Sequence, residues 1–260
     1  MRRWRTAESR RLTSSRVTET AAWGGRHAAL AAVLALAAYA APSLSVPARR
    51  FPGIVTRLPG RTDAVALTFD DGPHPRGTPA VLEALDRARA RATFFVVGEA
   101  VRRHRGLLAE ILSAGHEVAL HGDRHLPHAL MLPWSVGRDL ERGRAEVEQE
   151  AGVAVTALRA PHGAASLATL AYARRRGLTV AGWTRWGWDW RAAATAGSIA
   201  AAATRSLAGG EVILLHDSDA YSAPESWRAT AAAVPLICAE LARAGLAATP
   251  FRDVNVTLGD

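Results

Sequence analysis

Short apolar runs alternate with amphipathic stretches from about residue 62 to the end of the chain. The apolar runs are only a few residues long, as expected of buried strands, and between them apolar residues recur at helical spacing. The predicted strands are residues 64–69, 92–97, 117–120, 157–159, 179–183, 212–215 and 247–251, and the predicted helices lie near residues 79–91, 99–114, 134–151, 166–176, 197–208 and 225–244.

This alternation predicts an α/β fold with a parallel sheet and crossover helices. About seven such units are typical of a distorted (β/α) barrel that is slightly short of eight units. An open doubly wound sheet is the alternative, because periodicity alone does not separate the two. Both architectures place ligand sites at the carboxyl ends of the strands, so the residues that follow each strand are the candidates for chemistry.

Residues 1–48 differ from the rest and are predicted to form a separate N-terminal region, with a single catalytic domain over residues 62–254. An arginine-rich start is followed by Ala28–Ala41, which carries no charge and has no polar face. This order is typical of a secretory signal. The charge-free stretch His27–Ala48 is also just long enough to cross a bilayer. We therefore expect a cleaved signal or a membrane anchor, with the catalytic domain exported to the cell surface or secreted.

Composition argues against two classes of function. The formal charge is +8, but residues 1–41 hold seven arginines and two glutamates, which is +5, and no later stretch is a basic run interleaved with aromatic residues. Nucleic-acid binding is therefore not expected. The single cysteine, Cys238, excludes a disulfide framework and a cysteine-based zinc site.

Two of the predicted strands are followed by pairs of potential metal ligands. The first ends in Asp70 and Asp71, before Gly-Pro. Because neighbouring side chains of a strand point to opposite faces, one carboxylate could bind a metal while the other faces a substrate; a solvated turn is the simpler alternative. The third strand is followed by His121 and His125, which converge if the chain turns into a helix there. Taken alone, such a histidine pair is more often structural than metal-binding.

Later strands also end in residues suited to catalysis. Arg159 follows the fourth strand and could pair with a carboxylate. Four of the eight tryptophans lie within residues 183–190, where they form either an aromatic wall for sugar rings or a loop packed under its own side chains. His216 lies at the end of an apolar strand, which suits a general acid.

In chain order, these residues resemble the five motifs of the polysaccharide deacetylase family (the NodB homology domain, carbohydrate esterase family four). The resemblance covers roughly residues 62–254. Its most specific part is TFDDGP followed by ATFFVVG. The motifs are TFDDGP at 68–73, HxxxH at 121–125, RxPxG at 159–163, DW at 189–190 and LxH at 214–216.

The resemblance implies a metal-dependent hydrolase that removes acetyl groups from N-acetylated sugars. Asp71, His121 and His125 would hold a divalent ion, with zinc first and cobalt or nickel as alternatives. In this family the ion lowers the pKa of a bound water and polarises the amide carbonyl.

The resemblance also implies the remaining roles. Asp70 and His216 would be general base and general acid, and Arg159 would orient the base. His162 stands where the family usually has tyrosine, but its backbone N–H would still stabilise the oxyanion. The implied substrate-binding residues are Pro161, His162, Gly163, Trp190 and Leu214, the last two lining a pocket for the acetyl methyl group.

Two departures from the family pattern raise questions. Gly122 replaces a serine or threonine whose hydroxyl could brace the loop. Trp186, three residues before the Asp189-Trp190 pair, stands where the family usually has an aspartate. The resemblance implies that this aspartate tunes the pKa of the catalytic histidine. Either Asp189 or Asp217 could take over that role, and Asp189 is therefore a candidate catalytic residue. The residue that tunes His216 is therefore left open.

Three functions follow as alternatives. The leading one is deacetylation of a cell-surface polysaccharide such as peptidoglycan or a chitin-like glycan. The second is hydrolysis of another amide or ester, such as an O-acetyl glycan or a lipid-linked sugar. The third is a catalytically silent glycan-binding module, which is disfavoured because the base and all three metal ligands are present. The expected partners are the glycan and, if the N-terminal segment is not cleaved, a membrane.

Overall fold

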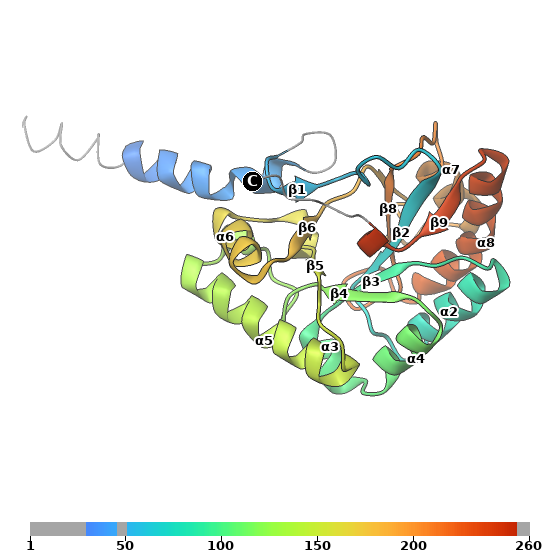
Figure 1. The fold of residues 1–260 in the computed structure, drawn as a ribbon, viewed down its shortest axis with the longest axis horizontal. Coiled ribbons are helices and arrows are strands. Elements are labelled where there is room, and N and C mark those ends of the chain that lie inside the picture. The colour runs from blue at the N-terminus through green and yellow to red at the C-terminus, as the bar shows by residue number, and fades with distance from the viewer. Residues whose placement is uncertain (1–29, 46–50, 254–260) are drawn as a thin grey trace, which may run out of the picture.

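The computed structural model describes residues 30–45 and 51–253 of the chain (Figure 1). Most of the predicted N-terminal region, including its arginine-rich start, lies outside the described residues. Residues 30–40 form a helix that continues into the short 3-10 helix η1 (Ala41–Ser45). Within residues 30–45 and 51–253, no helix is both long enough and apolar enough to cross a bilayer.

A nine-stranded sheet forms the centre of the molecule (Figure 1). Its order is β1-β6-β5-β4-β3-β2-β8-β7, with β9 also beside β2, and all pairs between named strands are parallel. The strands are β1 (Ile54–Val55), β2 (Ala64–Asp70), β3 (Thr93–Val96), β4 (Glu117–Leu120), β5 (Ala157–Leu158), β6 (Thr179–Ala181), β7 (Arg185–Trp186), β8 (Val212–His216) and β9 (Ala247–Thr249).

The strand order distinguishes between the two predicted architectures. From β2 to β6 each new strand adds beside the previous one in a single direction, whereas a doubly wound sheet reverses direction at a switch point. The predicted distorted (β/α) barrel is therefore confirmed. All seven predicted strands are present; β1 and β7 were not predicted, because two residues carry no periodicity. Within the described chain β1 and β7 do not pair, so strand pairing leaves the barrel open between them.

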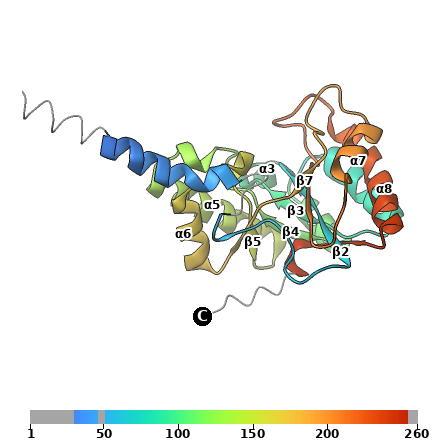
Figure 2. The same cartoon turned by 90° about the horizontal axis from the view of Figure 1, so that it is seen from above.

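Helices surround the sheet on its outer side (Figure 2). The stretch predicted as one helix over 99–114 is two helices, because Gly106 adopts a left-handed φ of 91° between them. The α-helices are α2 (Gly77–Arg87), α3 (Gly98–Arg103), α4 (Leu107–Ser113), α5 (Pro133–Ala151), α6 (Leu167–Arg176), α7 (Ala196–Ala203) and α8 (Trp227–Arg243), and three further 3-10 helices are η2 (His128–Leu130), η3 (Pro161–Gly163) and η4 (Phe251–Asp253).

The alternation of side chains along β2 shows how the core positions the site. Val65, Leu67 and Phe69 belong to the large apolar cluster that also contains residues of the surrounding helices. Ala66 belongs to a second, smaller cluster inside the barrel. Because side chains alternate along a strand, Asp70 shares the inner face with Ala66. The last residue of β2 therefore directs a carboxylate into the mouth of the barrel.

Candidate metal and active site

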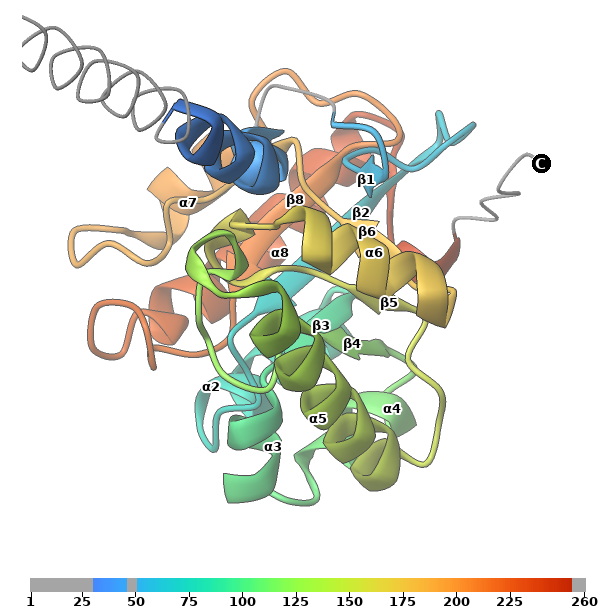
Figure 3. The same ribbon diagram turned by 90° about the vertical axis from the view of Figure 1, so that its left-hand side faces the viewer.

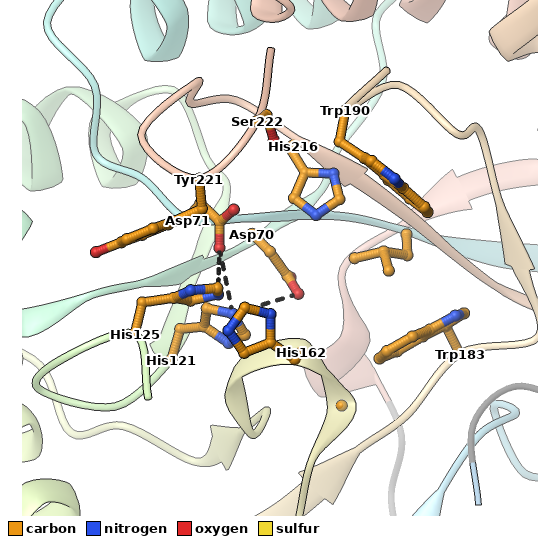
Figure 4. Close-up of a pocket in the computed structure, with 12 residues that line it drawn as sticks. Asp70, Asp71, His121, His125, His162, Trp183, Trp190, His216, Tyr221 and Ser222 are labelled. Carbon is orange, nitrogen blue, oxygen red and sulfur yellow. Dashed lines mark ion pairs between the residues drawn. The ribbon is translucent and has the colours of Figure 1, made fainter. Parts of the chain in front are cut away.

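A cavity of about 300 Å³ lies at the carboxyl ends of the strands (Figure 4). Most of the site residues predicted from the sequence line it, although they come from loops far apart in the chain. Arg159, Asp189 and Pro161 do not line the cavity, and the first two lie behind residues that do. The lining residues are Asp70, Asp71, His121, His125, His162, Gly163, Trp183, Trp190, Leu214, His216, Tyr221 and Ser222.

Asp71, His121 and His125 converge on one point of this cavity. Asp71 Oδ1 lies 3.1 Å from Nε2 of His125 and 3.4 Å from Nε2 of His121. One potential ligand atom from each of the three residues lies within 4.8 Å of the others. Burial opposes ionisation of Asp71, but the two facing imidazoles and the charge of His216 outweigh it and hold its pKa well below the usual range.

The donor set fits a divalent metal ion. The carbonyl oxygen of Arg159 lies 2.9 Å from Nδ1 of His121. If Nδ1 donates to this carbonyl, the lone pair of Nε2 is left for a metal. Asp71 Oδ1 is buried and has no hydrogen-bond partner. Two imidazoles and one carboxylate are a common ligand set of catalytic zinc, with coordination positions left for water and substrate.

Asp70 and Asp71 reach the same cavity, contrary to the expectation that they point to opposite faces. The expectation assumed that both residues have strand geometry. Asp70 is the last residue of β2, but Asp71 has a left-handed φ of 77°, which turns its side chain back toward the cavity. Aspartate tolerates this conformation better than most residues. The two carboxylates therefore differ by their partners rather than by the face they occupy.

Arg159 holds Asp70 in place from inside the barrel. Its Nη1 donates to Asp70 Oδ1 at 2.6 Å and to Thr68 Oγ1 at 2.9 Å, and its Nη2 donates to the carbonyl of Gly182 at 3.1 Å. The guanidinium lies 4.1 Å from the centre of the Phe95 ring. Burial lowers the pKa of Arg159 and Asp70 opposes that shift. The arginine is fully buried, so its geometry is fixed and it orients the carboxylate.

Asp189 is the partner of His216, which answers the question left open by the sequence. Asp189 Oδ1 lies 3.0 Å from Nδ1 of His216, and Oδ2 accepts from the His216 backbone N–H at 2.7 Å and from Thr230 Oγ1 at 2.9 Å. Burial lowers the pKa of His216, but the charge and hydrogen bond of Asp189 outweigh it and raise the pKa to about 10. With Nδ1 bonded to Asp189, Nε2 is the nitrogen available to a substrate.

His216 thus has a carboxylate partner in Asp189, although Trp186 stands where the family usually has an aspartate. Asp217 does not tune His216. Its Oδ2 accepts a hydrogen bond from Thr78, its Oδ1 has no hydrogen-bond partner, and burial raises its pKa to about 7.

Tyr221 was not predicted from the sequence. Its ring stacks on His125 with 3.9 Å between centroids and 16° between planes, and its hydroxyl donates to Glu99 at 3.4 Å. The His162 ring also contacts His125, edge to face, with 4.2 Å between the ring centroids and 63° between their planes. Burial lowers the pKa of His162. The loop after β8 carries no motif around Tyr221, so its position after a strand was the only available signal.

Gly122 is explained by its backbone. At its φ of 82°, an added Cβ would lie 3.1 Å from the carbonyl of Arg124 and 3.2 Å from Asp139 Oδ2. The same Oδ2 accepts from the Asp123 N–H at 3.0 Å, and Oδ1 accepts from Arg124 Nε at 3.1 Å. The loop between the two histidines is thus braced by a carboxylate of α5, and the missing hydroxyl has a substitute.

Figure 4 shows the carboxylates of Asp70 and Asp71 between the imidazole of His216 and those of His121 and His125. The cavity thus holds an oriented carboxylate, a possible metal site and a histidine with a raised pKa. Such a combination can take a proton from water, activate a carbonyl and protonate a leaving group. These are the elements of amide or ester hydrolysis.

Comparison with known proteins agrees with this chemistry. The polysaccharide deacetylase family profile matches residues 58–181. A peptidoglycan-N-acetylglucosamine deacetylase of Bacillus cereus is 33% identical over 168 residues, which are 64% of this chain and 78% of the relative. A chitooligosaccharide deacetylase of Sinorhizobium fredii is 36% identical over 59% of this chain and 72% of the relative. A family 4 acetyl xylan esterase from Clostridium thermocellum, solved with a cobalt ion, superposes with a TM-score of 0.67 and 29% identity over 74% of this chain and 89% of the esterase.

Proposed function

Because the chain belongs to the polysaccharide deacetylase family, we propose that it is a metal-dependent hydrolase of N-acetyl groups on a cell-surface polysaccharide. Peptidoglycan is the first substrate we expect, and a chitin-like glycan the second, because similar proteins are named for these two activities. The observation that carries the proposal is the convergence of Asp71, His121 and His125 in one cavity with Asp70 and His216.

Each side chain then has a role. Asp71, His121 and His125 hold the ion, which when bound supplies a water of lowered pKa and polarises the acetyl carbonyl. Asp70 accepts a proton from the attacking water. His216 donates the proton of its Nε2 to the departing sugar amine, while Asp189 keeps Nδ1 occupied.

The other predicted residues bind the acetyl group or support the site. Trp190 and Leu214 line the cavity and enclose the acetyl methyl group, which favours acetyl over larger acyl groups by about 1–3 kcal/mol per methylene. The backbone N–H of His162 contributes to oxyanion stabilisation. Gly163 lines the same wall, and Pro161 fixes the backbone of η3 that presents it.

Zinc is the ion we expect, with cobalt or nickel as alternatives, since two imidazoles and a carboxylate suit all three. The test is the metal content of the purified chain beside His121→Ala, His125→Ala and, as a matched control, His104→Ala. Near-stoichiometric metal in the parent and the control, and its loss in the other two variants, is the expected result. A parent chain that binds no ion in excess metal contradicts the proposal.

Substrate choice is tested by acetate release from three substrates: peptidoglycan, N-acetylglucosamine oligomers and O-acetylated xylan. Release from xylan alone would favour the second candidate, an ester hydrolase, which the likeness to an acetyl xylan esterase keeps open. A silent glycan-binding module would release no acetate from any substrate, and its Asp70→Asn variant would bind glycan as the parent does.

We further propose that the N-terminal region exports the domain, as a cleaved signal or as an anchor. Ala28–Ala41 is apolar, and the arginines that precede it favour retention of the N-terminus on the cytoplasmic side. A cleaved domain should then appear in the medium, and an anchored domain should be degraded by protease added to intact cells. Full protection of the domain in intact cells, with degradation after lysis, would contradict export.

A further inference from the structure

The segment that follows His125 exposes large apolar side chains. The exposed fraction is 84% for Leu130, 56% for Leu132, 61% for Trp134 and 37% for Leu126. We call residues 126–134 the apolar loop. Single exposed leucines are ordinary, but four large apolar residues within one loop need a partner to cover them.

The apolar loop has a fixed conformation. The Ala129 N–H donates to the carbonyl of Ala164 at 2.9 Å, and the Leu130 N–H donates to that of Pro127 at 3.0 Å. His128 is fully buried, with Nδ1 3.1 Å from Thr169 Oγ1. The backbone is thus held against η3 and α6 while the leucines point outward.

The helix of residues 30–40 lies beside this loop. The Tyr39 hydroxyl donates to the carbonyl of Met131 at 2.8 Å. Figures 1 and 3 show the helix leaving the body of the molecule near α6. Its exposed large apolar side chains are Leu30, Val33, Leu34 and Leu36, with exposed fractions from 57% to 73%. Together with the apolar loop they form what we call the apolar face.

Arginines border the apolar face. Trp134 lines one groove with Arg138, Arg175 and Arg176. The carboxylate of this groove, Glu141, is already paired with Arg176 and with Arg144. Within the described chain, Arg138 and Arg175 have no ion pair or hydrogen bond from their side chains. The border of the apolar face therefore has uncompensated positive charge.

We propose that the apolar face docks on an anionic phospholipid bilayer. Leu130 and Leu132 enter the boundary between headgroups and acyl chains, and Trp134 lies at headgroup level, where tryptophan is enriched. Arg138 and Arg175 face the lipid phosphates. The exposed leucines of helix 30–40 point to the same occupant, because they continue an apolar sequence preceded by arginines.

Docking has a consequence for the site. The apolar loop begins at the residue after His125, so a loop seated in the headgroups holds the catalytic cavity close to the membrane surface. Glycan near the bilayer is then deacetylated in preference to distant glycan. The docking itself rests on export of the domain and not on the reaction, so it can be tested without activity.

The test places a fluorophore on the apolar loop. In a Cys238→Ala background, the full chain carries Leu130→Cys with an environment-sensitive label and is inserted, one copy per disc, into nanodiscs of phosphatidylglycerol and phosphatidylcholine. The matched control is Leu236→Cys, since Leu236 is 44% exposed on α8, at the far end of the molecule in Figure 1. We expect a blue shift and quenching by spin-labelled lipid at position 130, and neither at 236.

The charge requirement is tested in the same discs. Arg138→Glu with Arg175→Glu should reduce the quenching at position 130, whereas Arg205→Glu, which changes an exposed arginine outside this groove, should leave it unchanged. An unquenched label at position 130 in an inserted chain would overturn the proposal. A blue shift that needs two copies per disc would also overturn it, because a second copy of the chain would then be the occupant.

Discussion

On each side of the catalytic cavity, a buried side chain of opposite charge holds a reactive group in place. On one side, Asp70 is held by the buried guanidinium of Arg159. On the other, His216 is held by the buried carboxylate of Asp189. The anionic partner favours the imidazolium of His216, which can donate a proton, whereas Arg159 fixes the orientation of the Asp70 carboxylate. The two buried neighbours therefore prepare the two sides for the different roles that we propose.

The most severe test of this comparison removes the two reactive groups. Asp70→Asn and His216→Ala should each lower kcat by about 10²–10⁴. Neither residue is one of the three proposed metal ligands, so both variants should keep the metal content of the parent. Steady-state kinetics with metal analysis checks this, and parent-like turnover in either variant would remove that residue from its role.

Removing the partner of the base should affect the fold as well as the reaction. Arg159→Met leaves Asp70 buried without its cation, and we expect a loss of about 3–5 kcal/mol in the free energy of unfolding. Denaturant titration measures it. Adding Asp70→Asn to the same chain should recover part of the loss, because the stranded charge is then gone. A double variant no more stable than Arg159→Met would point to lost packing against Phe95 instead.

Removing the partner of the acid should change the pH dependence. Asp189 raises the pKa of His216, so the protonated acid persists to higher pH and is lost as pH rises through that pKa. In Asp189→Asn, the alkaline limb of the kcat profile should move to lower pH, with kcat reduced by about 10- to 100-fold.

Thr230→Val is the matched control for this change, because it removes a hydrogen bond to Asp189 but keeps the carboxylate. Its alkaline limb should stay near that of the parent. An unmoved limb in Asp189→Asn would mean that His216 is not the group that titrates there.

Asp217 differs from Asp70 in that it is a buried carboxylate with no ion pair in the described part of the chain. Burial raises its folded pKa to about 7, above the ordinary aspartate value of 3.8. Ionisation therefore disfavours the folded state, and this residue's contribution to stability falls as pH rises from about 4 to 7. Asp217→Asn should be more stable relative to the parent at pH 8 than at pH 4. This is the smallest effect that we expect, and thermal unfolding of the two metal-free proteins at pH 4 and pH 8 measures it. A stability difference between variant and parent that is the same at both pH values would contradict the prediction.

Most of the fold could be predicted from the sequence, because strand and helix periodicity is a local property. Seven strands and the helices between them follow from it, as does the placement of chemistry at the strand ends. The motif order also predicts Asp71, His121 and His125 as metal ligands, and potential ligand atoms of all three converge in the structure. These residues are fixed by short spacings within or beside single elements.

The remaining features of the site depend on contacts between segments that are distant in the chain. The sequence offers both Asp189 and Asp217 as partners of His216. Asp189 is the partner because the loop before α7 packs against β8 and α8. Two further contacts between distant segments are of the same kind: Tyr221 stacks on His125, and the Tyr39 hydroxyl donates to the carbonyl of Met131. Periodicity determines which face of an element a side chain occupies, but the neighbour it meets there is set by how the elements pack together.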